Sequence, residues 1–251
     1  MCLGFSMTSY GYECKDVNGE RDVAKELYES FMENRTTSYI SGIDKPLGMF
    51  LDYYLAMDYF PSGEFHTMSS MKEDGTSTWG IMAFGIDADG LIRKTEEYNS
   101  KVSEIVNEMT QYDLTDREKL IYLNNRLIQI CDYDDNLQNY TAYDALINCS
   151  SVCDGYAKAY YSLCTAAGFP CKLYYGATNN SAYSNHAWNS VYVDGEWLYV
   201  DPTWNDADNK DKRNNYLLIS KEEMDKEHKE FFSWNNPIVD NFIENEENKE
   251  V

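Results

Sequence analysis

The sequence predicts an α+β fold, and three observations lead to this class. Apolar residues recur at helical spacing between Tyr98 and Met109 and again from Cys153 to Gly168. Segments rich in β-branched and aromatic residues, such as 78–86, are typical of strands. The pair Asp194-Gly195 separates two alternating segments and predicts an antiparallel hairpin. A chain that combines long helices with such hairpins falls in the α+β class.

Short helices and strands are expected to alternate at the start of the chain. Apolar residues at helical spacing predict a helix over 22–32, and 49–60 is expected to form another. Residues 36–43 and 78–86 predict strands. The acidic run 87–90 predicts a turn after the second strand, because it lacks the full ligand set of a calcium loop.

Helices dominate the middle of the chain. Residues 98–109 place four apolar side chains on one face. Thr115 and Glu118 have the spacing of a capping box, and the helix that follows them is expected to end near 131–134. A polar loop then leads to a short helix that begins at Tyr143.

The change from strand-rich to helical sequence predicts a boundary near residue 97. We expect an N-terminal α/β subdomain of unknown role over 1–97 and a larger domain over 98–240. The polar, acidic tail 241–251 is expected to be disordered, because it has too few apolar residues to join a core.

Composition excludes some classes of partner. The formal net charge of the 251-residue chain is −22, from 43 acidic and 21 basic residues, which disfavours nucleic acid and anionic membrane surfaces. No apolar run reaches the length of a membrane span. The 22 tyrosines suit packing in the core, and a groove with aromatic walls that binds peptide or glycan is the alternative.

Seven cysteines are an odd number, so at least one is unpaired or bonded to another chain. Cys2 and Cys14 are close enough in sequence to form a bridge. Cys149, Cys164 and Cys171 are expected to be small buried apolar residues. The cysteine pattern leaves the redox compartment open.

Cys153 has the sequence context of a helix N-terminus. Tyr156 and Tyr160 follow at helical spacing, and Gly168 with Pro170 ends the helix. The positive end of a helix dipole favours a thiolate, which is the reactive form of cysteine. Backbone N–H groups in the first turn are available to stabilise an oxyanion. Taken alone, the segment fits a structural cysteine at a helix start equally well.

The predicted hairpin brings a histidine and an aspartate together. With a two-residue loop, position 193 pairs with 196 and position 188 pairs with 201. His186 then lies opposite Thr203, with Asp201 as its diagonal neighbour on the same face, about 7–8 Å away. The carboxylate can hold one imidazole nitrogen and leave the other for a thiol. A slip of one residue would move the two side chains to opposite faces.

Competing explanations of these residues were weighed. A structural histidine, followed by an ordinary turn after a strand, is the alternative for this hairpin. Of the three histidines, His66 and His228 show neither an aligned acid nor a strand context. Cys149 and Cys153 have no second ligand pair, so neither a zinc site nor any other cofactor is expected. The chain also has no GxSxG, P-loop or dinucleotide motif.

Three segments resemble the transglutaminase-like superfamily, especially its bacterial members. They are VCDGYAKAY at 152–160, NHAWNSVYV at 185–193 and WLYVDPTWND at 197–206. The intervals of 33 and 15 residues between Cys153, His186 and Asp201 suit that family. The resemblance extends from about Thr115 to Asp206, and the first 97 residues carry no comparable motif.

The resemblance implies that 98–240 is a transglutaminase-like catalytic domain with a papain-like core, in which the nucleophile helix packs on an antiparallel sheet. It implies Cys153 as nucleophile, His186 as general base and then acid, and Asp201 as the residue that orients the imidazole. The implied chemistry attacks an amide, either a peptide bond or a glutamine side chain, through a thioester. The acyl group then passes to water or to an amine.

Other roles implied by the resemblance are less specific. Tyr133 is a candidate for supporting the oxyanion, and Trp188 and Trp204 are candidates for the walls of the cleft. The family contains proteases, cross-linking enzymes, deglycosylating enzymes and members without activity. The complete set of three residues favours an enzyme that acts on protein or peptide. A catalytically silent module that binds peptide or cell-wall polymer is the alternative, and the oligomeric state is left open.

The first five residues lack the basic region and apolar stretch of a signal peptide. We expect an extracellular or cell-surface bacterial protein whose leader is absent from this chain.

Overall fold

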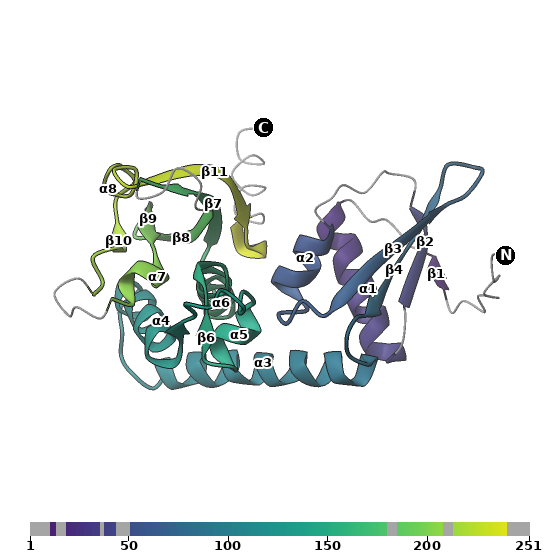
Figure 1. The fold of residues 1–251 in the computed structure, drawn as a ribbon, viewed down its shortest axis with the longest axis horizontal. Coiled ribbons are helices and arrows are strands. Elements are labelled where there is room, and N and C mark those ends of the chain that lie inside the picture. Colours follow the sequence, from purple (N-terminus) through teal and green to yellow (C-terminus); the bar gives the residue numbers. More distant parts are fainter. Residues whose placement is uncertain are drawn as a thin grey trace. The chain divides into compact units, whose positions relative to one another are not determined.

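The computed structural model of the chain describes residues 11–13, 19–35, 38–43, 51–179, 185–207 and 213–239. The chain forms two compact units, Met1–Glu96 and Glu97–Val251. The division falls within helix α3 (Ala88–Met109). Each unit has its own sheet, as Figure 1 shows. Helices combined with largely antiparallel sheets confirm the predicted α+β class.

The N-terminal unit packs helix α1 (Glu20–Asn34) against a four-stranded sheet, and helix α2 (Leu51–Asp58) packs on α1. The strand order is β1 (Gly11–Glu13), β2 (Ser38–Ile43), β4 (Ser77–Ala83) and β3 (Phe65–Met71). β1 and β2 run parallel and the other pairs run antiparallel. Apolar residues from both helices and from β4 share one core that includes Val23, Leu27, Phe31, Leu55, Phe60 and Ile81.

The predicted turn at 87–90 is wrong, because this segment begins helix α3. Asp87 precedes the helix, and its Oδ1 accepts a hydrogen bond of 2.7 Å from the backbone N–H of Gly90. Aspartate at this position satisfies a free N–H of the first turn, and it also favours turns, which explains the error. The proposed bridge between Cys2 and Cys14 and the tail 241–251 lie outside the described residues.

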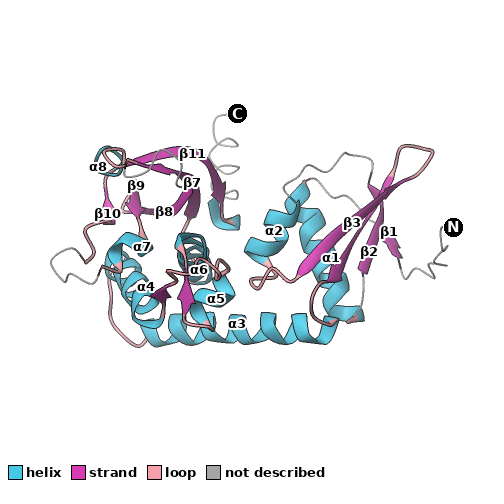
Figure 2. Ribbon diagram, viewed as in Figure 1, coloured by secondary structure: helices cyan, strands magenta, loops and turns pink. Residues whose placement is uncertain are grey.

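The C-terminal unit is built on a five-stranded antiparallel sheet with helices around it (Figure 2). The strand order is β10 (Leu217–Ile219), β9 (Glu196–Val200), β8 (Asn185–Val193), β7 (Cys171–Thr178) and β11 (His228–Asn235). The helices are α4 (Asp116–Ile130), α5 (Ala142–Leu146), α6 (Cys153–Ala166), α7 (Pro202–Asn205) and α8 (Lys221–Met224). A short parallel pair, β5 (Asp132–Tyr133) and β6 (Ser150–Ser151), precedes α6.

The helices of this unit follow their capping signals. Thr115 and Glu118 form the predicted capping box at the start of α4. Helix α6 begins at Cys153, and Gly168 after its C-cap has a φ of 84°, the left-handed conformation that glycine tolerates. Gly155 is needed for packing, because a Cβ there would lie 2.0 Å from the side-chain oxygen of Ser151.

The hairpin of β8 and β9 forms with the predicted loop. Asp194 and Gly195 both have positive φ, 55° and 85°, as a type I′ turn requires. Val193 pairs with Glu196, and the ladder continues in the predicted register. This register places alternate aromatic side chains of both strands on one face, where Trp188 and others form a small core.

The far end of the hairpin differs from the prediction. The ladder of β9 ends at Val200, so position 201 does not pair with position 188. Pro202 has no N–H for the sheet and instead occupies the first turn of α7, which also contains Thr203. The expectation that Thr203 lies opposite His186 is therefore wrong.

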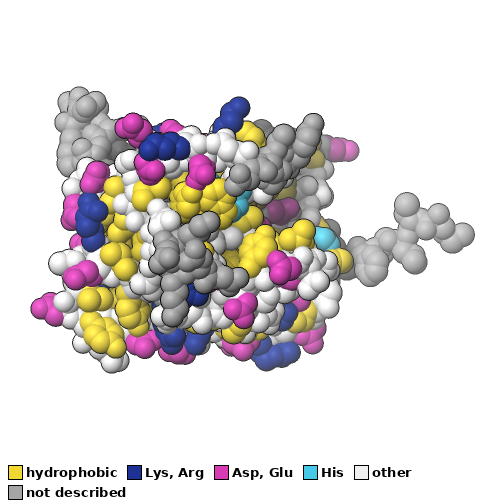
Figure 3. All heavy atoms as spheres, turned by 60° about the vertical axis from the view of Figure 1, so that its left-hand side comes forward, with side chains coloured by type: hydrophobic (Ala, Val, Ile, Leu, Met, Phe, Trp, Pro, Cys, Tyr) yellow, Lys and Arg dark blue, Asp and Glu magenta, His cyan; other side chains and the backbone are white. Residues whose placement is uncertain are grey.

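Strands β3, β7, β10 and β11 are additions to the predicted elements. β11 is an edge strand in which most side chains are exposed, so it lacks a clear apolar alternation. No helix among the residues that the structure describes is long and apolar enough to cross a membrane. On the face drawn in Figure 3, acidic side chains are spread among apolar ones.

Candidate active site

Cys153 is the first residue of α6 and is partly exposed. The preceding residue, Val152, donates its N–H to the carbonyl of Asn139 at 2.9 Å. No side chain caps the helix, so capping does not occupy the N–H groups of its first turn. α6 packs against β7 and β8 of the five-stranded sheet, as Figure 1 shows. The thiol therefore lies at a helix tip whose backbone N–H groups can face a substrate.

His186 and Asp201 meet through a short hydrogen bond. The Nε2 of His186, on β8, lies 2.7 Å from Oδ2 of Asp201, and both residues are buried. Asp201 is the N-cap of α7, and its Oδ1 accepts a hydrogen bond of 3.1 Å from the N–H of Trp204. Its backbone N–H donates to the carbonyl of Tyr216 at 2.9 Å. The carboxylate is thus held by its backbone, by the helix cap and by the imidazole.

The charges of these groups are coupled. Burial lowers the pKa of His186, but the carboxylate of Asp201 and hydrogen bonds to Asp201 and Cys153 raise it, to about 10. Burial raises the pKa of Asp201, and the opposing effect of His186 and the other donors leaves it well below the ordinary value. Since Nε2 faces the carboxylate, Nδ1 is left for Cys153. The structure therefore brings the three predicted residues together, and their catalytic roles stay a prediction.

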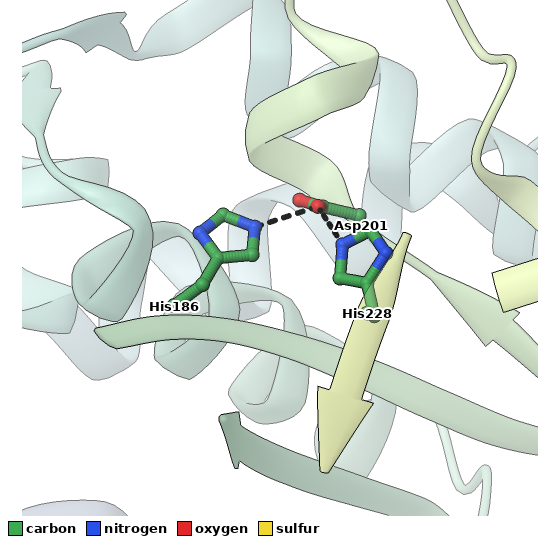
Figure 4. A group of neighbouring side chains, drawn as sticks. All are labelled: His186, Asp201 and His228. Carbon is green, nitrogen blue, oxygen red and sulfur yellow. Dashed lines mark hydrogen bonds and ion pairs between the residues drawn. The ribbon is translucent and has the colours of Figure 1, made fainter. Parts of the chain in front are cut away.

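His228 lies at the same carboxylate, which corrects the expectation that it has neither an acid nor a strand. It is the first residue of β11, and its Nε2 lies 3.0 Å from Oδ2 of Asp201. Figure 4 shows both imidazoles directed at this one oxygen from two different strands. The polar, exposed character of β11 hid this residue in the sequence. His66, the third histidine, also lies in a strand, β3.

The three side chains in Figure 4 also have the composition of a metal site. His186, Asp201 and His228 offer ligand atoms that lie within 4.8 Å of one another. In the described arrangement each imidazole uses its Nε2 to donate to the carboxylate. Hydrogen bonds among protein groups thus account for this cluster, in line with the expectation of a site without a metal.

The three cleft candidates occupy different environments. Tyr133 is 45% exposed in β5, and burial followed by the nearby Cys153 raises the pKa of its hydroxyl. Trp204 is partly exposed and lies 5.5 Å from the ring of His186, centre to centre. Trp188 is only 1% exposed, so its predicted place in a cleft wall is wrong. It packs beneath the site, because alternation along β8 directs it into the aromatic core.

The other described cysteines are free thiols. Cys164 and Cys171 are buried, as expected, and burial raises the pKa of Cys171. Cys149 is exposed, which contradicts the expectation that it is buried. Its φ is 59°, so the chain turns at this position just after α5 and keeps the side chain at the surface.

Two buried polar residues that sequence reasoning missed join the helix of Cys153 to the rest of the site. Asn189 of β8 donates its side-chain N–H to the carbonyl of Ala157 in α6 at 3.1 Å. The hydroxyl of Tyr156 donates to the carbonyl of Cys131 at 2.8 Å and also bonds Asp206 at 2.6 Å. Asn189 lies within the NHAWN segment three residues after the histidine, and its opposite orientation along the strand was the available signal.

Comparisons with known proteins agree on one family. The model of the transglutaminase-like superfamily matches residues 103–202. Human kyphoscoliosis peptidase is 29% identical over 120 residues, which cover 42% of this chain. The chain spans only 18% of the length of that relative.

Two solved structures align over much of the chain. A TGase structure has a TM-score of 0.38 and 16% identity, and the alignment covers 82% of this chain and 62% of the other. A candidate cysteine protease from Cytophaga hutchinsonii has a TM-score of 0.38 and 13% identity, with coverage of 68% and 73%. The family match itself contains all three predicted residues. Through residues 103–202, the chain belongs to the transglutaminase-like superfamily, which is related to cysteine proteases.

Proposed function

We propose that the chain is a cysteine-dependent enzyme that transfers an acyl group from an amide through a thioester. The proposal is carried by the 2.7 Å contact between His186 Nε2 and Asp201 Oδ2, which leaves the other ring nitrogen for Cys153. A nucleophile, a base and an orienting carboxylate in this sequence of contacts are what acyl transfer requires. The raised pKa of His186 supports an imidazolium beside a thiolate at neutral pH.

The first half-reaction forms the acyl-enzyme. The thiolate of Cys153 attacks the amide carbon, a C–S bond forms, and the carbonyl oxygen becomes an oxyanion. Backbone N–H groups in the first turn of α6 are in place to stabilise this charge, with the hydroxyl of Tyr133 as a further candidate. The imidazolium of His186 then gives its proton to the amide nitrogen. The C–N bond breaks, the amine leaves, and a thioester remains on Cys153.

The second half-reaction releases the acyl group. Neutral His186 takes a proton from water or from an amine, which attacks the thioester carbon. The C–S bond breaks, and the thiolate and imidazolium form again, while Asp201 stays ionised throughout. Water needs no binding site of its own, so hydrolysis is the simpler outcome, and transamidation of glutamine requires in addition a place for the amine.

The substrate class that we propose is protein or peptide. The segment before α5 exposes Leu137 at 66% and Tyr140 at 60%, in addition to Tyr133. Apolar side chains exposed on a segment that leads to the nucleophile can bind apolar residues of a peptide. The acidic charge of the chain would favour peptides with basic residues.

The test incubates the protein with a peptide library and a primary amine and reads the products by mass. Cleavage, deamidation and cross-linking to the amine each produce a different mass change. Cys153→Ala should abolish all of them, while Cys149→Ala, which removes another accessible thiol, should leave them unchanged. Turnover at the wild-type rate by Cys153→Ala would refute the mechanism. Peptide binding without any product, by a fully folded wild-type protein, would favour the catalytically silent module instead.

A further inference from the structure

We propose that His228 is a positioning residue that holds the carboxylate of Asp201 so that it can orient His186. This inference rests on the function proposed above. His228 lies beyond the matched segment 103–202, so the family match does not assign it a role.

The hydrogen bonds at Asp201 carry the first step. Oδ2 lies 2.7 Å from Nε2 of His186 and 3.0 Å from Nε2 of His228. A carboxylate oxygen has two lone pairs and can accept both N–H groups. Because the ionised carboxylate only accepts, each Nε2 must carry a hydrogen. With the N–H of Trp204 on Oδ1, three donors leave the carboxylate one orientation.

The second step is the burial of His228. The residue is 3% exposed, and its Nδ1 is buried without a hydrogen-bond partner among the described residues. The bond to Asp201 is thus the one contact in the described structure that uses the polarity of this ring. A buried nitrogen without a partner is costly, and an apolar side chain of similar size would fill the space without that cost. The cost is explained if the N–H donated to Asp201 is needed.

The third step is the packing that fixes the ring. The ring centre of His228 lies 4.5 Å from that of Trp204, 4.9 Å from that of Trp188 and 5.7 Å from that of Tyr216. Rings on several sides restrict rotation of the imidazole, so the donor on Nε2 keeps its direction. These same aromatic side chains were expected to serve only the core or the cleft.

The strand between the two histidines leaves room for this arrangement. β7 lies between β8 and β11, and its Gly176 pairs with His186. A Cβ on Gly176 would lie 2.6 Å from the ring of Trp188. The absence of a side chain at this position lets Trp188 pack beside His228 over β7, as part of one cluster. The glycine therefore belongs to the support of the carboxylate.

His228 exchanges no proton with the substrate in this scheme. Its N–H keeps Asp201 ionised and prevents the carboxylate from turning away when His186 moves between thiol and leaving group. Supporting hydrogen bonds of this kind are worth about 10- to 100-fold in activity where they have been measured at metal and catalytic sites.

The experiment measures the rate at which iodoacetamide alkylates Cys153, across the pH range in which His186 and Asp201 titrate. An imidazolium–thiolate pair shows itself as a reactive plateau on the acid side of the profile. We expect His228→Leu, which removes the donor and keeps an apolar volume, to lower this plateau about tenfold and to move its acid limb to higher pH. His228→Gln can donate an N–H to Asp201 and should restore most of the reactivity. His66→Leu, at an exposed histidine of the N-terminal unit, is the matched control and should behave as wild type.

Several results would overturn the inference. His228→Leu with a wild-type profile, or His228→Gln as impaired as His228→Leu in folded protein, would exclude a role for the donated N–H. If the variants do not fold, imidazole NMR of the wild type still decides, because a His228 ring with hydrogen on Nδ1 alone cannot donate to Asp201. Failure of the proposed function looks different, since Cys153 of the wild type would then lack the acid-side plateau and His186→Ala would not change its alkylation.

Discussion

Replacing Asp201 with asparagine tests the electrostatic basis of the site while keeping its helix cap. The asparagine Oδ1 can still accept the N–H of Trp204, so α7 should keep its start. The amide N–H₂ group, however, would face the Nε2 of His186, where a carboxylate now accepts at 2.7 Å. The imidazole must then carry its hydrogen on Nδ1, and it can no longer take the proton of Cys153.

The structure also sets the expected magnitude. The pKa of His186 rises from 6.5 to about 10, with Asp201 as the main cause that opposes burial. At 1.36 kcal/mol per pKa unit, this difference is on the order of 5 kcal/mol in favour of the imidazolium. Loss of the greater part of it should lower kcat/KM by about three orders of magnitude.

The assay combines peptide turnover with alkylation of Cys153 by iodoacetamide, and circular dichroism confirms that the variant is folded. Both rates should fall in Asp201→Asn, and the acid-side reactivity of the thiol should disappear. A folded Asp201→Asn protein whose kcat/KM stays within about tenfold of wild type would refute the electrostatic reasoning, because a group worth several kcal/mol cannot be removed at so small a cost.

Three further outcomes follow from the structure. A group whose pKa is raised on folding stabilises the fold below its unfolded pKa, so the contribution of His186 is complete below pH 6.5 and is lost as the pH rises to about 10. Urea midpoints should therefore fall through this window in wild type and change less in Asp201→Asn, and parallel slopes would contradict this. Gly155→Ala should destabilise the fold by about 2 kcal/mol in urea denaturation, since its Cβ would lie 2.5 Å from a backbone carbonyl, and an unchanged midpoint would show that α6 can shift. Asn189→Ala leaves the carbonyl of Ala157 unpaired and should cost about 1–3 kcal/mol, which wild-type stability of the variant would disprove.

Local signals in the sequence were sufficient for several elements. The capping box at Thr115, the helix start at Cys153 and the two-residue loop at Asp194-Gly195 all depend on neighbours within about four residues. The register of the hairpin follows from its loop, because the number of loop residues sets which positions pair. The proximity of His186 and Asp201 was predicted by this route, although the pairing beyond Val200 was not.

Contacts between distant segments had to await the fold. The bond of His228 to Asp201 joins residues 27 positions apart through an edge strand that has no clear periodicity. The burial of Trp188 depends on rings contributed by β7 and β9, and the exposure of Cys149 depends on the path of the chain after α5. None of these partners lies near the residue in the sequence.

The order of Cys153, His186 and Asp201, and the helix and hairpin that carry them, are readable from the amino acids, because caps, turns and alternation act over a few residues. The surroundings of the carboxylate are not. Three donors converge on Asp201 from β8, from β11 and from its own helix cap. Such convergence is set by the order and twist of a sheet, a property of the packed chain as a whole that no single segment encodes.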